Sequence, residues 1–458
     1  MTKTDPIDRR LRAAARNLLL CLVRYRVSRA AYRFVPGPVR HRLLAALEHG
    51  VVTAPGFRSL PPLASNRDAT CAMDEASRVA VKTGEGVNVF GHLHGEFGLG
   101  ESARMYAGAL IGAGVPVTLN DLAHDVPHAF GDTSLDVATR QGAPYAVNLL
   151  FANPDYMQRA IEFVGPAAWE GRTTIGCWFW ELETIPGEWQ EAIDAVDGIM
   201  VASAFTEEAF RRATDKPVFR VKLPLPALDA SDASRRDFDL PEDAFVFLVS
   251  FDFNSSIYRK NPIAAIDAFR SAFPSSREDV RLMVKSSNGH RYPEHMSQLL
   301  AAASQDPRIL VRDQVLPIAH MHALQKCADA YVSLHRAEGF GLGLAESMAM
   351  GKPVIATAWS GNMDFMDADN SCLVDYRLVP VGEGEYPHAA GTRWADPDTQ
   401  QAAAWMRRLV DTPGLAAGLG RKAADHIRSD LSPDRAASAI VDAIRLITIR
   451  REERPCQN

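Results

Sequence analysis

The residues His335-Arg336-Ala337-Glu338-Gly339-Phe340-Gly341-Leu342-Gly343-Leu344-Ala345-Glu346 carry the pattern from which the fold of this chain can be predicted. Strand-forming residues precede them at 331–334, and the glycines fold tightly enough to bring backbone amides near a ligand. A helix is expected from about Gly341 to Gly351, where a glycine and then Pro353 end it. The predicted order is therefore strand, loop, helix and strand.

The expected start of this helix is suited to an anion. A helix that begins just after glycines presents unpaired N–H groups and the positive end of its dipole, so phosphate or pyrophosphate is a natural ligand. Glu338 lies before the helix and Glu346 lies within it. A ligand with phosphates in its middle and hydroxyl groups at both ends would satisfy both carboxylates, and a nucleotide sugar has this form.

The longer run E-G-F-G-L-x-x-x-E-x-M-A-x-G-x-P-V-I-A-T, from Glu338 to Thr357 and followed by Ser360-Gly361-Asn362, resembles the E-x7-E motif of glycosyltransferase family 4. The resemblance implies a retaining enzyme of the α/β class with the GT-B fold, in which two Rossmann-like, doubly wound parallel-sheet domains face a cleft. The alternative is that the run is an ordinary strand, helix and strand of a protein core.

The resemblance covers roughly residues 85–450 and gives the expected domains. An acceptor-binding domain is expected at 81–235, a donor-binding domain at 236–425, and a final helix within 426–458 that crosses back onto the first domain. The length of 458 residues fits two domains plus an extension. The net charge of −6 argues against nucleic acid as a partner, and six scattered cysteines without metal spacing fit a reducing cytoplasm.

The first fifty residues differ from the rest in charge. They contain eleven Lys/Arg and three Asp/Glu, a net +8, which leaves −14 for the remainder. One interpretation is a pair of interfacial helices that bind the anionic inner face of the cytoplasmic membrane, and the alternative is a helical extension packed on the main body. The apolar run 18–23 is too short to span a bilayer, and no signal peptide is expected. Residues 51–80 are predicted to be a linker.

The first α/β series is expected to supply part of the ligand site. Its predicted strands lie at 87–91, 146–151, 174–180 and 198–202. Gly98 and Gly100 are expected in a loop between the first strand and a helix at 103–111. The resemblance makes this loop face the donor phosphates, and the alternative is a plain tight turn. The resemblance places Trp180 and Glu181 near the position where many family members carry a histidine that touches the donor sugar, so both are expected on the acceptor or sugar side. Glu181 could orient the acceptor, and the alternative is that the aromatics are core and Glu181 caps a turn.

The second α/β series is expected to supply the cations that neutralise the leaving diphosphate. The resemblance places Lys260 at the position of the family lysine, with Arg259 beside it, and Lys285 is expected at a strand end that either faces the cleft or is solvated. A cation that contacts the phosphate neutralises the charge of the leaving group, as a metal ion would. Lys260 and Glu338 are the expected catalytic residues. The expected donor-binding residues are Gly98, Gly100, Arg259, Lys285, Gly339, Phe340, Gly341, Leu342 and Glu346.

No metal site or cofactor is predicted. His92 and His94 lack a third ligand at a fixed spacing, and the triplet Asp367-Ala368-Asp369 is interpreted as a loop because the E-x7-E helix is present. The resemblance implies transfer of a hexose, such as mannose, from a nucleotide diphosphate sugar to a saccharide or lipid-linked acceptor, in surface polysaccharide synthesis. The alternatives are a phosphorylase-like or epimerase-like enzyme of the same fold, and a non-catalytic, nucleotide-sugar-binding scaffold at the membrane.

Overall fold

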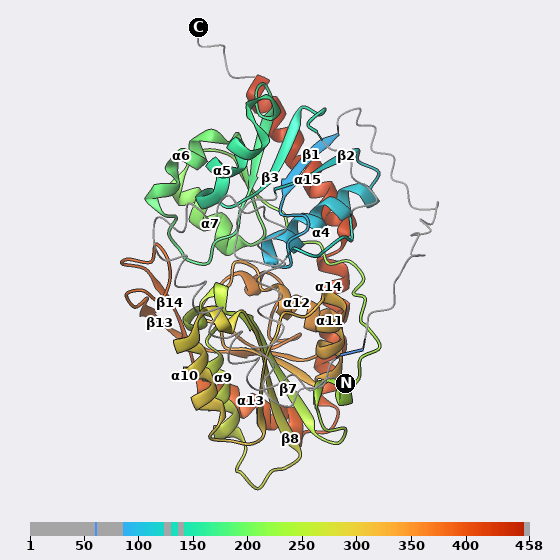
Figure 1. The fold of residues 1–458 in the computed structure, drawn as a ribbon, viewed down its shortest axis with the longest axis vertical. Coiled ribbons are helices and arrows are strands. Elements are labelled where there is room, and N and C mark those ends of the chain that lie inside the picture. Colours follow the sequence, from blue (N-terminus) through green and yellow to red (C-terminus); the bar gives the residue numbers. More distant parts are fainter. Residues whose placement is uncertain (1–59, 62–85, 123–129, 136–141, 453–458) are drawn as a thin grey trace, which may run out of the picture.

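The computed structural model describes residues 86–452 except 123–129 and 136–141, together with Leu60 and Pro61. Two parallel sheets of six strands each, flanked by helices, form the upper and lower halves of the molecule (Figure 1). The basic extension predicted at residues 1–50 lies outside the described residues, as does nearly all of the linker predicted at 51–80. The expected α/β architecture with two doubly wound sheets is confirmed.

The first sheet has the strand order β2-β1-β3-β4-β5-β6, and every neighbouring pair is parallel. Its strands are β1 Val87–Gly91, β2 Val117–Asp121, β3 Val147–Phe151, β4 Thr173–Cys177, β5 Gly198–Val201 and β6 Val218–Arg220. Its helices are α4 Gly98–Gly112, α5 Pro154–Val164, α6 Gln190–Ala195 and α7 Ala204–Ala213. Residues of β1, β3, β4 and β5 are buried throughout, because helices cover both faces of such a sheet.

The second sheet has the order β12-β11-β10-β7-β8-β9 and is also parallel. Its strands are β7 Phe245–Asp252, β8 Val280–Ser287, β9 Ile309–Asp313, β10 Ala330–Ser333, β11 Val354–Thr357 and β12 Cys372–Val374. Its helices are α8 Ile257–Lys260, α9 Pro262–Ala272, α10 Pro293–Ala303, α11 Ile318–Cys327, α12 Leu342–Ala349, α13 Thr399–Asp411 and α14 Leu415–Asp430. The strand order reverses between β7 and β10, and ligands of open α/β sheets bind at the carboxyl ends of such strands.

A two-stranded sheet and a final helix complete the fold. The antiparallel pair β13 Tyr376–Pro380 and β14 Arg393–Pro397 stands apart from both sheets, at the level where the two halves meet (Figure 1). The last helix, α15 Pro433–Glu452, packs against α4 and places Ile447 against Gly198 of β5. Helix α15 therefore supports the first sheet.

Helix α14 supports the helix of the central motif through a contact that only glycine permits. A Cβ added to Gly420 would lie 1.8 Å from the backbone oxygen of Gly351, at the end of α12. Gly351 itself has φ of 72°, the left-handed conformation expected just past a helix end. The close approach fixes the distance between α12 and α14.

We predict that Gly420→Ala lowers the free energy of unfolding by about 2 kcal/mol or more, because the backbones must separate to admit a methyl group. Gly418→Ala is the matched control, since an added Cβ there meets nothing within 4 Å and alanine favours the helix by up to about 1 kcal/mol. Thermal unfolding of both variants measures the difference. Equal melting temperatures for the two variants would contradict the close contact.

Candidate active site

The motif lies at the point where the second sheet reverses its strand order. Strands β7 and β10 are neighbours, so the segments that follow them lie side by side. The segment after β7 carries Arg259 and Lys260 in the short helix α8, and the segment after β10, residues 334–341, is called the motif loop here. Arg336 N–H donates to Arg259 O at 2.8 Å, which ties the two segments together.

Glu338 is buried between two cations. Its Oε1 lies 2.5 Å from Lys260 Nζ and its Oε2 lies 3.1 Å from Arg259 Nη1. Glu338 is only 5% exposed, and burial alone would raise its pKa, but Lys260 and Arg259 outweigh burial and hold the pKa at about 2. The site therefore contains an ionised carboxylate at neutral pH.

The side chains of Arg259 and Lys260 differ in how many of their N–H groups are already hydrogen-bonded. Besides Glu338, Arg259 donates to Ala337 O at 2.9 Å and to Ser255 O at 3.1 Å. Burial disfavours its charge, but Glu181 and Glu338 raise its pKa. Within the described part of the chain, the Lys260 ammonium group donates one hydrogen bond, to Glu338, although it has three N–H donors. Burial lowers the pKa of Lys260 against the opposing effect of Glu338. Of the two, Lys260 keeps the greater capacity to bind an anion.

Glu181 reaches this site from the first domain. Its Oε1 lies 3.6 Å from Arg259 Nη2, and its Oε2 accepts a hydrogen bond of 2.6 Å from the hydroxyl of Tyr386. Trp180 is placed differently, because its ring is 4% exposed, lies against Trp189 and donates to Thr184 O at 2.7 Å. The structure thus brings Glu181 to the predicted site residues and packs the Trp180 ring in the core.

The motif loop forms the junction between the domains. Ser203 Oγ, at the start of α7, donates to Gly339 O at 2.5 Å, and a Cβ added to Gly339 would lie 3.1 Å from Trp180 O. On the other side, Ser360 Oγ accepts from Glu338 N–H at 2.8 Å. A Cβ on Gly361 would lie 2.2 Å from Gly339 O. Gly361 therefore has no room for a side chain where its backbone meets that of Gly339, a constraint that the sequence interpretation did not foresee.

His335 is a residue of the motif to which the sequence assigned no role. It is fully buried, and its Nε2 faces two acceptors, Asn362 Oδ1 at 3.1 Å and Trp359 O at 3.2 Å. Nε2 therefore carries the proton, and Nδ1 accepts from Ser333 Oγ at 2.9 Å. Burial lowers the pKa of His335, which keeps it neutral. This histidine fixes the motif loop against residues 357–362. Its place directly after a buried strand was the available signal.

Helix α12 begins as predicted, one residue after Gly341, which has φ of 98° and no side-chain cap. Its first N–H groups are therefore without a side-chain partner at the cap, which is the arrangement expected of an anion site. Leu342 packs at the edge of the core, and Phe340 is buried against Phe365 with ring centroids 5.1 Å apart. Gly343 admits the Tyr331 hydroxyl, which would lie 2.9 Å from a Cβ at that position.

Glu346 points into a second polar cluster, separate from Glu338. Its Oε2 accepts from Gln325 Nε2 at 2.9 Å, and its Oε1 lies 3.7 Å from His322 Nε2. Burial lowers the pKa of His322, but Glu346 raises it, and Glu101 of α4 adds to the rise, so the net shift is upward. Glu346 of α12 and His322 of α11 thus form a buried polar pair inside the second domain.

The predicted loop around Gly98 and Gly100 is wrong in one respect, because both glycines lie in the first turn of α4 rather than before it. A Cβ on Gly100 would lie 2.6 Å from the oxygens of His92 and Gly95, so this glycine serves close packing. Gly98 is exposed and has nothing within 4 Å of an added Cβ. Of the two glycines, Gly98 is exposed and Gly100 is buried.

The prediction that Lys285 ends its strand is also wrong, because β8 continues to Ser287 through pairing with β7. Lys285 is 9% exposed, and burial lowers its pKa while Asp252 and Asp313 oppose the shift. Lys285 pairs in register with Ser250, whose hydroxyl lies 2.8 Å from that of Tyr331. Paired residues of a sheet share a face, so Lys285 lies on the face that carries the first turn of α12.

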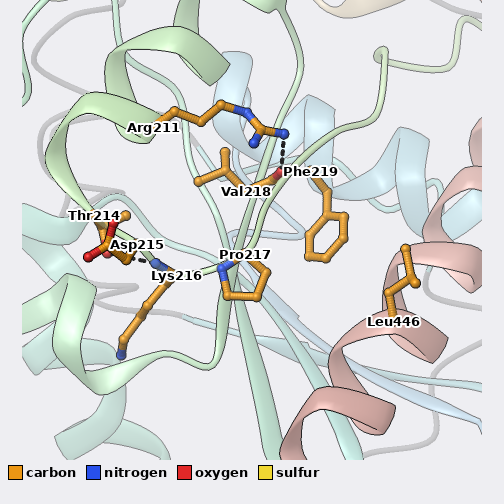
Figure 2. A pocket seen from close by; sticks show the side chains of 8 residues that line it. All are labelled: Arg211, Thr214, Asp215, Lys216, Pro217, Val218, Phe219 and Leu446. Carbon is orange, nitrogen blue, oxygen red and sulfur yellow. Dashed lines mark hydrogen bonds between the residues drawn. The ribbon is translucent and has the colours of Figure 1, made fainter.

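A hollow elsewhere on the surface contains none of these residues. It lies beside β6, the edge strand of the first sheet, and Figure 2 shows Leu446 of α15 on one side of it and Arg211 of α7 on the other. Arg211 donates to Val218 O at 3.1 Å, which covers part of the strand edge. In the described part of the chain, no group of three or more His, Cys, Asp or Glu could hold a metal ion, and no helix is both long and apolar enough to cross a bilayer.

Solved structures share this architecture. HepE from Anabaena, in complex with UDP and glucose, superposes with a TM-score of 0.56 at 14% identity, covering 79% of this chain and all of that chain. Sucrose-phosphate synthase from Thermosynechococcus elongatus gives a TM-score of 0.56 at 14% identity, covering 80% of this chain and all of that chain. The two six-stranded Rossmann-like domains are those of the GT-B fold, as predicted.

Sequence comparison finds similar proteins and a matching family model. Residues 253–385 match the family described as "Glycosyl transferases group 1", which confirms the resemblance found in the motif. Trehalose synthase from Rubrobacter xylanophilus is 25% identical over 176 residues, or 37% of each chain. D-inositol 3-phosphate glycosyltransferase from Salinispora tropica is 30% identical over 223 residues, or 46% of this chain. The matches span 37% and 40% of the length of these two relatives.

We predict that the stabilising effect of Glu338 depends on pH. Its pKa in the folded state, about 2, lies below the ordinary value of 4.5, so its contribution is fully present above pH 4.5 and is lost as the pH falls toward 2. Glu338→Gln should therefore lower the melting temperature at pH 7, with a difference from the wild type that narrows below pH 4.5. Glu278→Gln, at an exposed position of the same domain, is the control. A constant difference between pH 3 and pH 7 would refute the buried ion pairs.

Proposed function

We propose that this protein is a retaining glycosyltransferase that moves a hexosyl group, mannose or a similar hexose, from a nucleotide diphosphate sugar to a saccharide or lipid-linked saccharide. The observation that carries the proposal is the ionised, buried Glu338 between Lys260 and Arg259, beside the uncapped start of α12. Such a site can bind an anion and a polyol together. The group 1 match over residues 253–385 includes all of these residues and supports the same class of reaction.

In this proposal the diphosphate binds at the N–H groups that begin α12, with Lys260 and Lys285 as its cations. Lys260 then contacts the phosphate as well as Glu338. Glu338 accepts hydrogen bonds from donor-sugar hydroxyls. Its negative charge favours the positive charge that develops on the sugar as the bond to the leaving oxygen breaks. No protein nucleophile is required.

The bond changes balance within donor and acceptor. The bond from the anomeric carbon to the diphosphate oxygen breaks, and a bond from the acceptor oxygen to the same carbon forms on the same face. The acceptor proton passes to the departing diphosphate oxygen. Glu181, held at the edge of the site, would orient the acceptor, and no metal or cofactor takes part.

The nature of donor and acceptor is proposed from the comparisons. HepE was solved with UDP and glucose, which makes UDP-glucose the first donor to test. We place the reaction in the cytoplasm, in surface polysaccharide synthesis, with the basic residues 1–50 on the anionic inner face of the membrane. Those residues lie outside the described structure.

A panel of UDP-, GDP- and ADP-sugars tests the proposal. Thermal shift identifies a donor, and slow donor hydrolysis without acceptor shows that the site cleaves the sugar–phosphate bond. Binding without cleavage or transfer, over a panel of saccharide acceptors, would favour the nucleotide-sugar-binding scaffold. Strict dependence of cleavage on inorganic phosphate would favour a phosphorylase. If no sugar nucleotide raises the melting temperature, the proposal fails.

We predict that Lys260→Ala lowers kcat/KM by at least tenfold, because loss of one charged contact to a leaving group costs about 2 to 4 kcal/mol. Steady-state donor hydrolysis and transfer measure the effect. Lys422→Ala, at an exposed position of α14, is the matched control and should have wild-type kinetics. Unchanged kinetics for Lys260→Ala would assign the phosphate to Lys285 or Arg259 instead.

We also predict that deletion of residues 1–50 leaves donor hydrolysis nearly intact and reduces binding to anionic vesicles. The deletion removes eleven Lys/Arg and three Asp/Glu, a net +8, and each basic residue near an anionic surface contributes about 1 kcal/mol. Co-sedimentation with phosphatidylserine-containing and neutral vesicles measures binding. Equal sedimentation of both proteins contradicts the membrane role, and a truncated protein that does not fold supports the packed extension.

A further inference from the structure

The loop of residues 381–392, between β13 and β14, connects the second domain to the first, and we call it the cross-domain loop. On the side of the second domain, Ser256 Oγ donates to Glu385 O at 2.8 Å. On the side of the first, His388 lies 3.5 Å from a carboxylate oxygen of Asp155 and 3.8 Å from one of Glu188. This loop therefore contacts both domains beside the candidate active site.

Tyr386 lies at the centre of the cross-domain loop. Its hydroxyl donates to Glu181 Oε2 at 2.6 Å, and its ring centre lies 5.7 Å from the guanidinium carbon of Arg259. The same ring contacts those of Trp180 and Trp394, with centroids 5.9 Å and 6.3 Å away. Burial raises the pKa of this phenol, which keeps its proton available for Glu181. The ring thus packs the site, and the hydroxyl makes a directed hydrogen bond to a carboxylate.

A continuous series of charged contacts leads from this hydroxyl to Glu338. Glu181 Oε1 lies 3.6 Å from Arg259 Nη2, and Arg259 Nη1 lies 3.1 Å from Glu338 Oε2. Arg259 is 4% exposed, and a buried guanidinium depends on the carboxylates that surround it. Glu181 is more exposed, with 19% of its side chain accessible, so it needs a partner to stay in one orientation. Tyr386 is that partner.

We propose that Tyr386 is a positioning residue whose hydroxyl fixes Glu181 and, through Glu181 and Arg259, sets the orientation of Glu338 for the transfer reaction. The inference rests on the proposed function. It adds to it a residue outside the motif, contributed by the cross-domain loop, that completes the site only when both domains are in place. A hydrogen bond to a charged group is stronger than one between neutral groups, so its loss should be measurable.

Tyr386→Phe separates the two roles of the side chain, because it keeps the ring and removes only the hydroxyl. We expect kcat for transfer to fall about tenfold while the donor KM changes by less than about twofold, since the donor phosphates bind elsewhere. Tyr376→Phe is the matched control, at a 36% exposed position of β13 in the same hairpin, and should leave both constants unchanged. In a Glu181→Ala background, Tyr386→Phe should lower kcat by less than about twofold further, because residues that act through one another are not additive.

Each outcome decides one question. If the wild type neither cleaves nor transfers any nucleotide sugar, the proposed function fails and the inference falls with it. If the wild type is active and Tyr386→Phe has the same kcat, only the inference is overturned. It is likewise overturned if Tyr386→Phe lowers the melting temperature but not kcat, if the donor KM rises instead, or if the effects of Tyr386→Phe and Glu181→Ala multiply.

Discussion

The burial of Glu338 between Lys260 and Arg259 is the interaction on which the rest of the site depends. A buried charge is tolerated only when it is paired and hydrogen-bonded, so each of these groups requires the others. The pairing comes from the meeting of the segments that follow β7 and β10. Such a cluster holds cations and a carboxylate side by side. In the proposed function, the cations bind the diphosphate of the donor and the carboxylate binds its sugar hydroxyls.

The same contacts define the site and hold the two domains together. Gly339 accepts a hydrogen bond from Ser203 of the first domain, and Arg259 faces Glu181, which also comes from that domain. Asp364, after β11, accepts from Ala204 N–H at the start of α7, at 2.9 Å. A change in the relative placement of the domains would therefore change the contacts of Arg259. The geometry of the site depends on how the two domains are placed.

Much of the fold was predictable, because buried strands and the helix after the motif have strong local patterns. Two predicted boundaries, the start of α4 and the end of β8, were wrong, and each error has a physical cause. Helix α4 begins at Gly98, although glycine disfavours helices, because packing of Gly100 on the oxygens of His92 and Gly95 outweighs its low propensity. Strand β8 continues past Lys285 because Ser286 and Ser287 pair with β7, and polar residues at a strand end give no sign of that pairing.

The sequence alone determined the local features of the site: the order strand, loop, helix, the glycines at its turn, and the chemical groups Glu338, Glu346, Arg259 and Lys260 within one family motif and its neighbourhood. Tertiary structure alone decided which of these groups meet. Glu338 pairs with Lys260 because β10 lies beside β7, Glu346 faces Gln325 instead, and Tyr386 reaches Glu181 across 205 positions of sequence. The reason is that local patterns encode the backbone conformation of each segment, whereas contacts between distant segments follow from how whole sheets order their strands and pack.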